Sequence, residues 1–177
     1  YCNAGMYLVD LKKWREEKVE DKIIKRIHEQ NGNVFFFEQT LMNWSCSGKI
    51  LQLPPKYNAY TLFWAFTYKN LICWRKPNAF YLESEVEEAK DNPIIIHFTR
   101  NFYMLSRPWI KGCDHPKTKE YVKYKLLTPW KQLEEDNRSK KSIRRYKLWH
   151  IIPQRILAIG AGVIYNEVRP KLWWKNE

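Results

Sequence analysis

Apolar residues recur at helical spacing in the segment that follows residue 18. Val19, Ile23 and Ile27 repeat every four positions, which places them along one face of a helix. Acidic residues come early in this segment and basic residues late, the order that the helix dipole favours. Because Asn31-Gly32 is typical of a helix end, the pattern predicts an amphipathic helix that begins near Val19 and ends before Asn31.

The rest of the chain alternates between helix-like and strand-like patterns, which is typical of an α/β protein. The other segments with a helical pattern are residues 10–14, 38–44, 83–90 and 119–127. The segments that we expect to be extended are residues 6–9, 49–53 and 56–58. Pro54 and Pro55 are interpreted as excluding helix at that point. The aromatic-rich stretch 59–82 fits either a helix or a cover over a sheet.

One apolar run carries a polar residue near its end. Residues 94–99 are Ile-Ile-Ile-His-Phe-Thr, and Arg107 follows ten residues after His97. The β-branched run predicts a buried strand, and strand ends are where α/β proteins hold ligands. An imidazole can ligate a metal, and a guanidinium can neutralise phosphate oxygens. A histidine at a strand end is more often structural, so these residues alone do not establish a metal site.

The composition is that of a folded domain. The chain has 177 residues, of which 45% are hydrophobic and 16% aromatic, enough for one substantial core. The four cysteines lack the paired spacing of a zinc knuckle or a disulfide scaffold, so we expect reduced thiols in a cytoplasmic protein. The longest apolar run, residues 156–165, is well short of the roughly 20 residues that span a membrane. We therefore expect no transmembrane helix and, from the residues that follow Tyr1, no secretory signal.

Positive charge gathers toward the C-terminal end. The net charge is +12, and residues 140–177 hold nine Lys or Arg against two Glu. Basic residues interleave there with Trp, Ile and Leu, and Trp173-Trp174 follows, a pattern typical of a helix at a membrane surface. The alternatives are a basic tail that packs on the domain and a nucleic-acid-binding module. We favour the membrane surface and expect no nucleic-acid partner, because no recognition motif accompanies the charge.

Five motifs occur together in one order and resemble glycosyltransferase family 8. They are Tyr1-Cys2-Asn3-Ala4-Gly5-Met6, Glu38-Gln39-Thr40-Leu41-Met42-Asn43, Leu53-Pro54-Pro55-Lys56-Tyr57-Asn58, Ile96-His97-Phe98 with Arg107-Pro108-Trp109, and Gly112-Cys113-Asp114-His115-Pro116 with Thr128-Pro129-Trp130. The resemblance extends to bacterial members of the lipopolysaccharide or general-stress type. It implies the C-terminal part of a GT-A fold, a mixed α/β sheet with flanking helices that binds a nucleotide sugar, followed here by a basic amphipathic helical tail.

The resemblance also implies roles for individual residues. His97 would be the histidine ligand of a divalent metal, Mn²⁺ or Mg²⁺. Arg107 would contact the diphosphate in place of the usual lysine, and a guanidinium suits phosphate oxygens equally well. Asn3, Ala4 and Gly5 would approach the donor sugar, where small residues let the backbone come close.

Two further residues, Glu38 and Gln39, would act at the sugar itself. By the resemblance, Glu38 would bind sugar hydroxyls and Gln39 would lie near the anomeric carbon. An amide is a poor nucleophile, so we prefer a same-face displacement in which the departing diphosphate helps to deprotonate the acceptor. Gln39 would then stabilise the positive charge that develops on the sugar. Helix capping and pairing with the helix dipole are the structural alternatives for both residues.

The chain departs from the family pattern at several points. The aspartate-any-aspartate metal motif is absent, since no two of the aspartates stand two residues apart. In the family that motif belongs to an N-terminal half, and we expect this chain to lack that half and to be inactive alone. Thr40 replaces a second acid, Arg100 replaces a common glycine, and four extra residues separate His97 from Arg107.

Together these features predict a retaining, metal-dependent hexosyltransferase that uses a UDP-sugar donor and a saccharide or glycolipid acceptor of the cell envelope or surface. We expect residues 1–130 to be part of its catalytic domain, residues 131–139 to be a linker, and residues 140–177 to be the tail. The tail would hold the protein on the inner, cytoplasmic face of the membrane. The alternative is a non-catalytic remnant of such an enzyme that binds a membrane surface or a polyanion.

Overall fold

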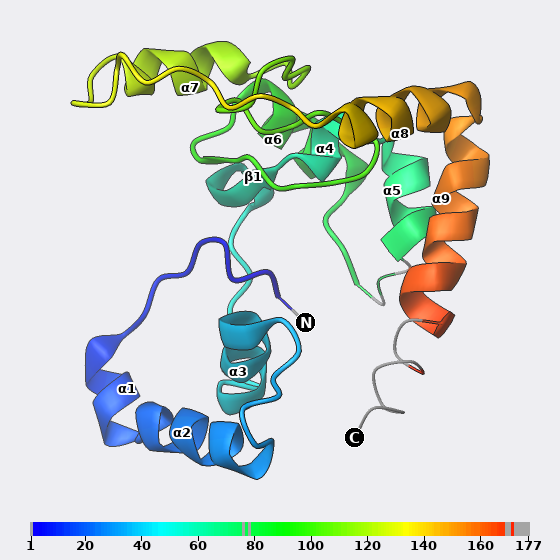
Figure 1. The fold of residues 1–177 in the computed structure, drawn as a ribbon. Coiled ribbons are helices and arrows are strands. Elements are labelled where there is room, and N and C mark those ends of the chain that lie inside the picture. Colours follow the sequence, from blue (N-terminus) through cyan, green and yellow to red (C-terminus); the bar gives the residue numbers. More distant parts are fainter. Residues whose placement is uncertain (1, 76, 78, 169–170, 172–177) are drawn as a thin grey trace. The chain divides into compact units, whose positions relative to one another are not determined.

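The computed structural model describes residues 2–75, 77, 79–168 and 171 (Figure 1). The chain divides into two compact units, Tyr1–Pro54 and Pro55–Glu177. Tyr1 of the first predicted motif and Trp173-Trp174 of the tail lie outside the described residues. The expected organisation into a catalytic part, a linker and a tail stays a prediction for the whole protein.

The first unit is built from helices. α1 spans Leu11–Glu16, α2 spans Val19–Glu29 and α3 spans Phe37–Ser45, so the predicted helices of this unit are confirmed. Asn31, just beyond α2, has the left-handed backbone of a helix stop (φ 47°), and the Gly32 N–H donates to the Ile27 carbonyl at 2.9 Å. α2 packs against α3, where the Arg26 guanidinium lies 3.0 Å from the centre of the Trp44 ring. This packing supports the helix that carries Glu38 and Gln39.

Two predicted strands in the first unit are wrong. Residues 6–9 and 49–53 form no regular secondary structure. Their apolar side chains face solvent rather than a sheet, since Leu8 is 86% exposed and Leu51 is 92% exposed. A strand needs a hydrogen-bonded neighbour to satisfy its backbone groups. Without such a neighbour, an apolar run stays irregular.

The second unit contains a small parallel sheet. β1 (Ala59–Tyr60) pairs with β2 (Ile96–His97), with Ala59 opposite Ile96 and Tyr60 opposite His97. Helices surround this pair (Figure 1), which confirms the α/β class. The predicted buried strand over residues 94–99 is wrong in extent, because only its two middle residues pair and Ile94 is 57% exposed.

A 3₁₀ helix, η1 (Pro55–Asn58), leads into β1. The expected extended segment at residues 56–58 is therefore wrong, and so is the exclusion of helix by the two prolines. Pro55 occupies the first position of the helical turn, where no backbone N–H is needed and the fixed φ of proline suits the geometry. The turn places Asn58 directly before β1, beside the strand that carries His97.

The aromatic-rich stretch forms the core of the second unit. α4 (Leu62–Ala65) and α5 (Tyr68–Arg75) lie within it, and α6 (Glu83–Asp91) follows where the sequence predicts a helix. Phe63, Leu71 and Val86 are fully buried. The helical interpretation of residues 59–82 is thus confirmed for α4 and α5, whose apolar side chains gain their stability from burial.

The C-terminal part of the second unit is helical as predicted. It contains α7 (Thr118–Lys125), α8 (Lys140–Ile151), α9 (Gln154–Val163) and a π-helical turn, η2 (Ile164–Val168). α9 lies along α5 (Figure 1), with Leu157 and Ala158 buried. One face of the tail therefore packs on the rest of the unit, as expected for the alternative of a basic tail that packs on the domain.

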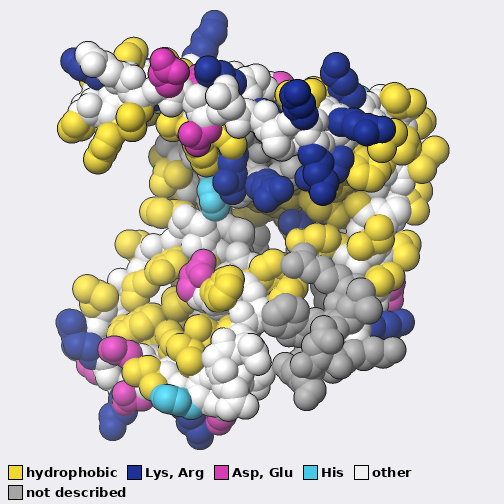
Figure 2. Space-filling model, viewed as in Figure 1, with side chains coloured by type: hydrophobic (Ala, Val, Ile, Leu, Met, Phe, Trp, Pro, Cys, Tyr) yellow, Lys and Arg dark blue, Asp and Glu magenta, His cyan; other side chains and the backbone are white. Residues whose placement is uncertain are grey.

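The outer surface of α8 is basic. Figure 2 shows Lys and Arg side chains gathered over this helix, and Arg144, Arg145 and Lys147 are all exposed. Within the described residues, no single helix is long and apolar enough to cross a membrane. In the same described part of the chain, α8 and the α9–η2 segment taken together reach the length and composition of a span, and the chain bends by 112° between them.

Candidate functional site

The turn at Asn3–Gly5 is anchored on the first turn of α3. The Asn3 Nδ2 amide donates to Gln39 Oε1 at 3.1 Å, and the Ala4 backbone N–H donates to the same oxygen at 3.2 Å. Within the turn, the Gly5 N–H donates to Asn3 Oδ1 at 2.8 Å. The structure therefore brings together four of the residues that were predicted to approach the sugar.

The orientation of the Gln39 amide is defined by these contacts. A backbone N–H can only donate, so the Gln39 atom facing Ala4 must be the oxygen and not the nitrogen. With Asn3 and Ala4 as donors, both lone pairs of Oε1 are occupied. The Gln39 NH₂ group has no partner among the described residues. Gln39 thus offers an amide donor to a ligand.

Sequence reasoning missed Asn43, one turn further along α3. Its side chain accepts from the Cys2 N–H at 2.5 Å and donates to the Cys2 carbonyl at 2.7 Å. The same NH₂ group donates to the Gln39 carbonyl at 2.8 Å. Asn43 therefore fixes the backbone of the N-terminal segment beside Gln39. The available signal was its spacing, because a residue four positions after Gln39 lies on the same face of the helix.

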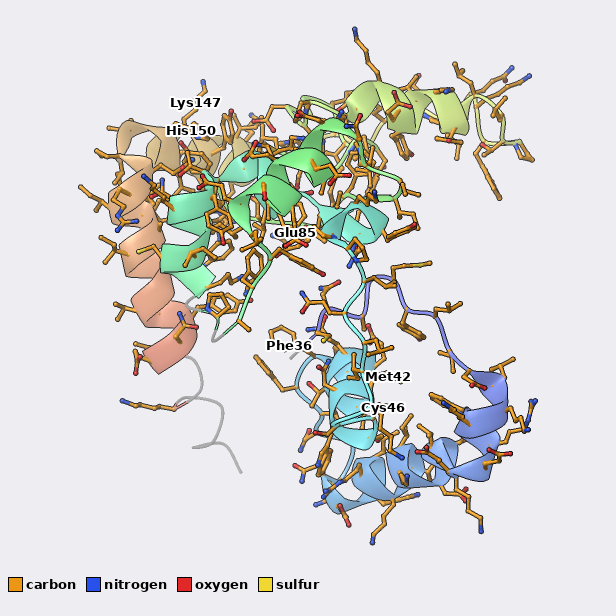
Figure 3. All side chains as sticks on the ribbon, turned by 180° about the vertical axis from the view of Figure 1, so that it is seen from behind. Phe36, Met42, Cys46, Glu85, Lys147 and His150 are labelled. Atoms are coloured by element: carbon orange, nitrogen blue, oxygen red, sulfur yellow. The ribbon has the colours of Figure 1, made fainter. Side chains whose placement is uncertain are left out.

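The entry to α3 is strained. Phe36 (φ 60°) and Phe37 (φ 45°) adopt a left-handed backbone that aromatic residues rarely adopt, and Figure 3 shows Phe36 at this end of the helix. Each such residue costs on the order of 1 kcal/mol, and this kind of strain gathers at functional sites. The pair directly precedes Glu38, whose exposed carboxylate has no partner among the described residues. Glu38 is therefore accessible to a ligand.

Thr40, which the resemblance led us to expect in place of a second acid, has a structural contact in this chain. Its hydroxyl donates to the Phe35 carbonyl, which closes the turn that leads into α3. Short polar side chains commonly satisfy backbone groups at helix starts in this way. The Thr40 hydroxyl therefore stabilises the entry to the helix that carries Glu38 and Gln39.

His97 is oriented by Asn58. Its Nδ1 lies 3.0 Å from Asn58 Oδ1, and with this amide oxygen as acceptor Nδ1 carries the proton and the lone pair lies on Nε2. Burial lowers the pKa of His97 below its usual range, which keeps the imidazole neutral at pH 7. A neutral imidazole whose second nitrogen is hydrogen-bonded is the form that ligates metals. Sequence reasoning named His97 but missed Asn58, although Asn58 ends one of the five motifs.

Arg107 lies in the loop that follows β2. Its guanidinium carbon is 5.4 Å from the centre of the Trp109 ring, and its Nε is buried without a hydrogen-bond partner among the described residues. Thr99 Oγ1 and Asn101 Nδ2 in the same loop are also buried and unpaired there. Unpaired buried polar atoms are rare in folded proteins. The loop therefore has hydrogen-bonding capacity that no described protein group uses.

His97 can supply one ligand to a metal ion, through its Nε2 atom. Among the described residues, no group of three or more His, Cys, Asp or Glu side chains is arranged to hold a metal ion. Mn²⁺ and Mg²⁺ prefer several oxygen ligands, chiefly carboxylates and water. The described part of the chain therefore contributes a single imidazole, and any complete metal centre needs further ligands.

The chain is similar to one known family and to several known proteins. The model of glycosyl transferase family 8 matches residues 1–111. General stress protein A of Bacillus subtilis (strain 168) is 26% identical over 132 residues, which cover 73% of this chain and 42% of that protein. Lipopolysaccharide 1,2-glucosyltransferase of Escherichia coli (strain K12) is 30% identical over 171 residues, which cover 93% of this chain and 45% of that protein. The chain thus spans less than half the length of these relatives, and no solved structure matches it.

The matched region contains every residue predicted for the site from the sequence. These residues are Asn3, Ala4, Gly5, Glu38, Gln39, His97 and Arg107. The match covers more than half of the chain and runs from the first compact unit into the second. The resemblance inferred from the five motifs is therefore confirmed, and the chain belongs to glycosyl transferase family 8.

Proposed function

We propose that the complete protein is a retaining hexosyltransferase that moves a hexose from a UDP-sugar to a saccharide or glycolipid of the cell envelope or surface. The observation that carries this proposal is the family match over residues 1–111, which includes Gln39, His97 and Arg107. The Escherichia coli relative, named as a lipopolysaccharide glucosyltransferase, supports a hexose donor and an envelope acceptor. The proposal concerns the whole protein, to which this chain contributes one part.

The first unit would contact the donor sugar. The turn at Asn3–Gly5 presents backbone and small side chains, which allow a sugar to approach closely. The Gln39 NH₂ group would donate to a sugar oxygen, and the exposed Glu38 carboxylate would accept from sugar hydroxyls. The bonds from Asn3 and Ala4 to Gln39 keep these groups in fixed relative positions before the sugar binds, which lowers the entropic cost of binding.

The contacts of Gln39 favour a same-face displacement over a covalent intermediate. Attack on the anomeric carbon by Gln39 Oε1 would first break its hydrogen bonds with Asn3 and Ala4. In the same-face route the acceptor hydroxyl forms the new bond, the bond to the diphosphate breaks, and the acceptor proton passes to the diphosphate. Gln39 would hold the sugar through its NH₂ group, since the oxygen that could face the developing positive charge already accepts from Asn3 and Ala4.

Arg107 would contact the diphosphate of the donor. Its buried, unpaired Nε and its permanent charge suit phosphate oxygens, which accept charge-assisted hydrogen bonds from guanidinium groups. Thr99 and Asn101 could add uncharged donors from the same loop, since each has an unpaired buried atom. The loop would then stabilise the charge left on the departing diphosphate.

Mn²⁺ or Mg²⁺ is the expected cofactor and, when bound, would neutralise charge on the diphosphate. His97 would hold the ion through Nε2, with Asn58 orienting the ring. The aligned segments make up only 42% and 45% of the two relatives, which leaves a large part of such proteins to contribute carboxylate ligands. For the same reason we propose that this chain alone is inactive.

The fold of the complete domain is proposed to be of the GT-A type, with a larger mixed sheet. β1 and β2 would be two parallel strands of that sheet, and His97 is the last residue of β2. Ligands of open parallel sheets bind beyond the carboxyl ends of the strands. The position of His97 at such an end supports this proposal.

Replacing His97 with alanine in the complete protein is expected to lower Mn²⁺-dependent hydrolysis of the UDP-sugar donor by about tenfold or more, because one metal ligand is lost. The rate is measured as UDP release over a series of Mn²⁺ concentrations. Asn58→Ala should raise the Mn²⁺ requirement by a smaller factor, since Asn58 only orients the ring. His28→Ala, at an exposed position of α2, is the matched control and should keep the parent rate.

An unchanged Mn²⁺ dependence in the His97→Ala protein would remove His97 from the metal site. The alternative of a non-catalytic remnant predicts a different pattern. In that case the complete protein neither hydrolyses nor binds a UDP-sugar, and the coding sequence upstream of Tyr1 carries no aspartate-any-aspartate motif.

We also propose that the tail binds an anionic membrane surface on the cytoplasmic side. The outward-facing apolar side chains of α9 and η2 include Ile156 (60% exposed), Ile159 (48%), Val163 (45%) and Ile164 (60%). The helix before α9 in the sequence, α8, carries exposed Lys and Arg side chains. A combination of apolar and basic residues is typical of interfacial helices. Binding would bring the enzyme to lipid-linked acceptors.

Replacing both Ile156 and Ile164 with serine is expected to reduce flotation of the chain with phosphatidylglycerol vesicles by about tenfold or more, because two large apolar side chains no longer enter the interface. Substitution is preferable to deletion of the tail, since Leu157 and Ala158 of α9 are buried. Ile24→Ser, 46% exposed on α2, serves as the control. Equal flotation of the double variant and the parent chain would contradict the proposed membrane contact.

A further inference from the structure

The second unit contains a cavity between α7 and the segment that joins α6 to β2. Its volume is about 550 Å³, within the range of small-molecule sites. Its lining includes Asp91, Asn92, Phe98, Glu120, Tyr121 and Tyr124. None of the residues predicted to contact the donor sugar, the diphosphate or the metal ion lines this cavity.

The cavity lies on the face of β2 opposite to His97. Ile96 and Phe98 line the cavity, whereas the ring of His97, between them in the sequence, is bonded to Asn58. Successive side chains of an extended chain point to opposite faces. A ligand in this cavity would therefore occupy a different place from a metal ion on His97.

Aromatic rings form one wall of the cavity. Tyr121 and Tyr124 are three positions apart on α7, so they lie on the same helix face. The Tyr121 ring is held by Phe98 and Trp109, at ring-centre distances of 6.1 Å and 6.0 Å. Tyr124 is 64% exposed. The Lys123 ammonium lies 5.9 Å from the Tyr124 ring centre. The wall thus combines one ring packed among aromatic neighbours with one exposed ring that has a cation nearby.

The polar side chains of the cavity have unused hydrogen-bonding capacity. Within the described residues, the Asp91 and Glu120 carboxylates form no ion pair, and the side chains of Asn92, Tyr121 and Tyr124 form no hydrogen bond. Lys117 is the exception, because its Nζ donates to the Asp91 carbonyl at 3.3 Å. The cavity therefore offers carboxylates that accept, an amide that both donates and accepts, and phenolic hydroxyls that do both.

We propose that this cavity binds a neutral hexose residue of a saccharide. A pyranose ring has a C–H face that packs on an aromatic ring and a rim of hydroxyls that donate to carboxylates and exchange hydrogen bonds with amides. The two carboxylates outnumber the single lysine of the lining, which disfavours a nucleotide or another phosphate. Resting on the proposed transferase function, the bound hexose is part of the acceptor, because the donor sugar is assigned to the residues around Gln39.

Binding is tested on the full chain with maltose and lactose as probes, by NMR of the tyrosine ring signals during titration. The expected result is saturable shifts of the Tyr121 and Tyr124 signals, with a dissociation constant in the range of about 1 mM for so small a ligand. Tyr124→Ala should weaken binding by about tenfold, which corresponds to losing one aromatic contact. Glu120→Gln should weaken it by a smaller factor, because an amide oxygen accepts less strongly than a carboxylate.

The matched control is Tyr7→Ala, because Tyr7 is an exposed tyrosine (51%) of the first unit. This variant should bind both disaccharides like the parent chain. Tyr124 is mostly exposed, so its replacement should leave the circular dichroism spectrum unchanged. The proposal is overturned if neither disaccharide shifts the tyrosine signals, or if Tyr124→Ala binds as tightly as the parent.

Failure of this proposal is distinguishable from failure of the transferase function. In the complete protein, Tyr124→Ala should raise the KM for a saccharide acceptor and leave hydrolysis of the UDP-sugar unchanged. Absence of UDP-sugar hydrolysis together with disaccharide binding would contradict the transferase function and leave the hexose site standing. Hydrolysis together with absence of disaccharide binding would overturn the hexose site alone.

Discussion

Replacing Gly162 with leucine is expected to lower the free energy of unfolding of the second unit by about 3 kcal/mol. Gly162 lies where α9 meets α5, and a Cβ atom there would lie 3.1 Å from the Cys73 carbonyl oxygen and 3.3 Å from the Trp74 carbonyl oxygen. Both oxygens belong to the α5 backbone, so the helices must separate to admit a side chain. Asn166 donates from Nδ2 to the Gly162 and Trp74 carbonyls at 2.8 Å and 2.9 Å. It would lose these hydrogen bonds when the helices separate.

Gly160 on the same helix is the matched control. It is exposed, and a Cβ atom there would meet nothing within 4 Å. Gly160→Leu is therefore expected to raise the stability by up to about 1 kcal/mol through its better helix propensity. Urea unfolding followed by circular dichroism measures both variants. Equal unfolding midpoints for the two leucine variants would contradict the close packing of α9 on α5.

The stability of the second unit is expected to fall on acidification because His115 is buried in its neutral form. His115 is 3% exposed, and its ring centre lies 4.9 Å from that of Trp64 and 4.8 Å from that of Phe98. Its Nδ1 accepts from the Lys117 N–H at 3.2 Å, and its Nε2 has no partner among the described residues. Burial lowers the pKa of His115 to about 4, with Asp114 opposing this shift and Lys117 adding to it.

The direction of the pH dependence follows from the protons bound in each state. The pKa of His115 is about 4 in the folded state, whereas the ordinary pKa of histidine, expected in the unfolded state, is 6.5. Between these values the unfolded state binds more protons, so the free energy of unfolding rises with pH. The contribution of neutral His115 to the free energy of unfolding is complete above pH 6.5 and is lost as the pH falls toward 4. This loss is on the order of 3 kcal/mol. His97, whose pKa burial also lowers, acts in the same direction.

His115→Phe tests this prediction, since it keeps an aromatic ring against Trp64 and Phe98 and removes the titration. The free energy of unfolding of this variant, measured with urea over the range of about pH 4 to 7, should vary less with pH than that of the parent. His28→Phe changes an exposed histidine of the first unit and should keep the parent slope. A His115→Phe protein with the full slope would show that another group carries the pH dependence.

Helices such as α2 and α6 could be predicted because their signals are local. In α2, apolar residues recur at helical spacing, Glu20 and Asp21 lie in the first turn, and Arg26 lies in the last. α6 likewise has Glu83 in its first turn and Lys90 in its last. Helix hydrogen bonds join residues four apart, so the residues that stabilise each helix lie within the segment itself.

The strands could not be predicted in the same way because each depends on a distant partner. The apolar runs at 6–9 and 49–53 resemble the run at 94–99, yet only the last contains a strand. The difference is that Ile96 and His97 meet Ala59 and Tyr60. The pairing of these two strands depends on how helices α4 and α6 pack around the sheet. The residue pattern of a single strand carries no information about that packing.

The sequence by itself determined the family and the types of residue in the candidate site, because Asn3, Gln39, His97 and Arg107 lie in motifs whose order and spacing are readable along the chain. Only the tertiary structure decided how these groups are held. The Gln39 oxygen meets Ala4 across 35 residues, and His97 meets Asn58 across 39. Such contacts depend on backbone positions set by the packing of whole helices and strands, whereas a motif or a helical period is stabilised by neighbours a few residues away.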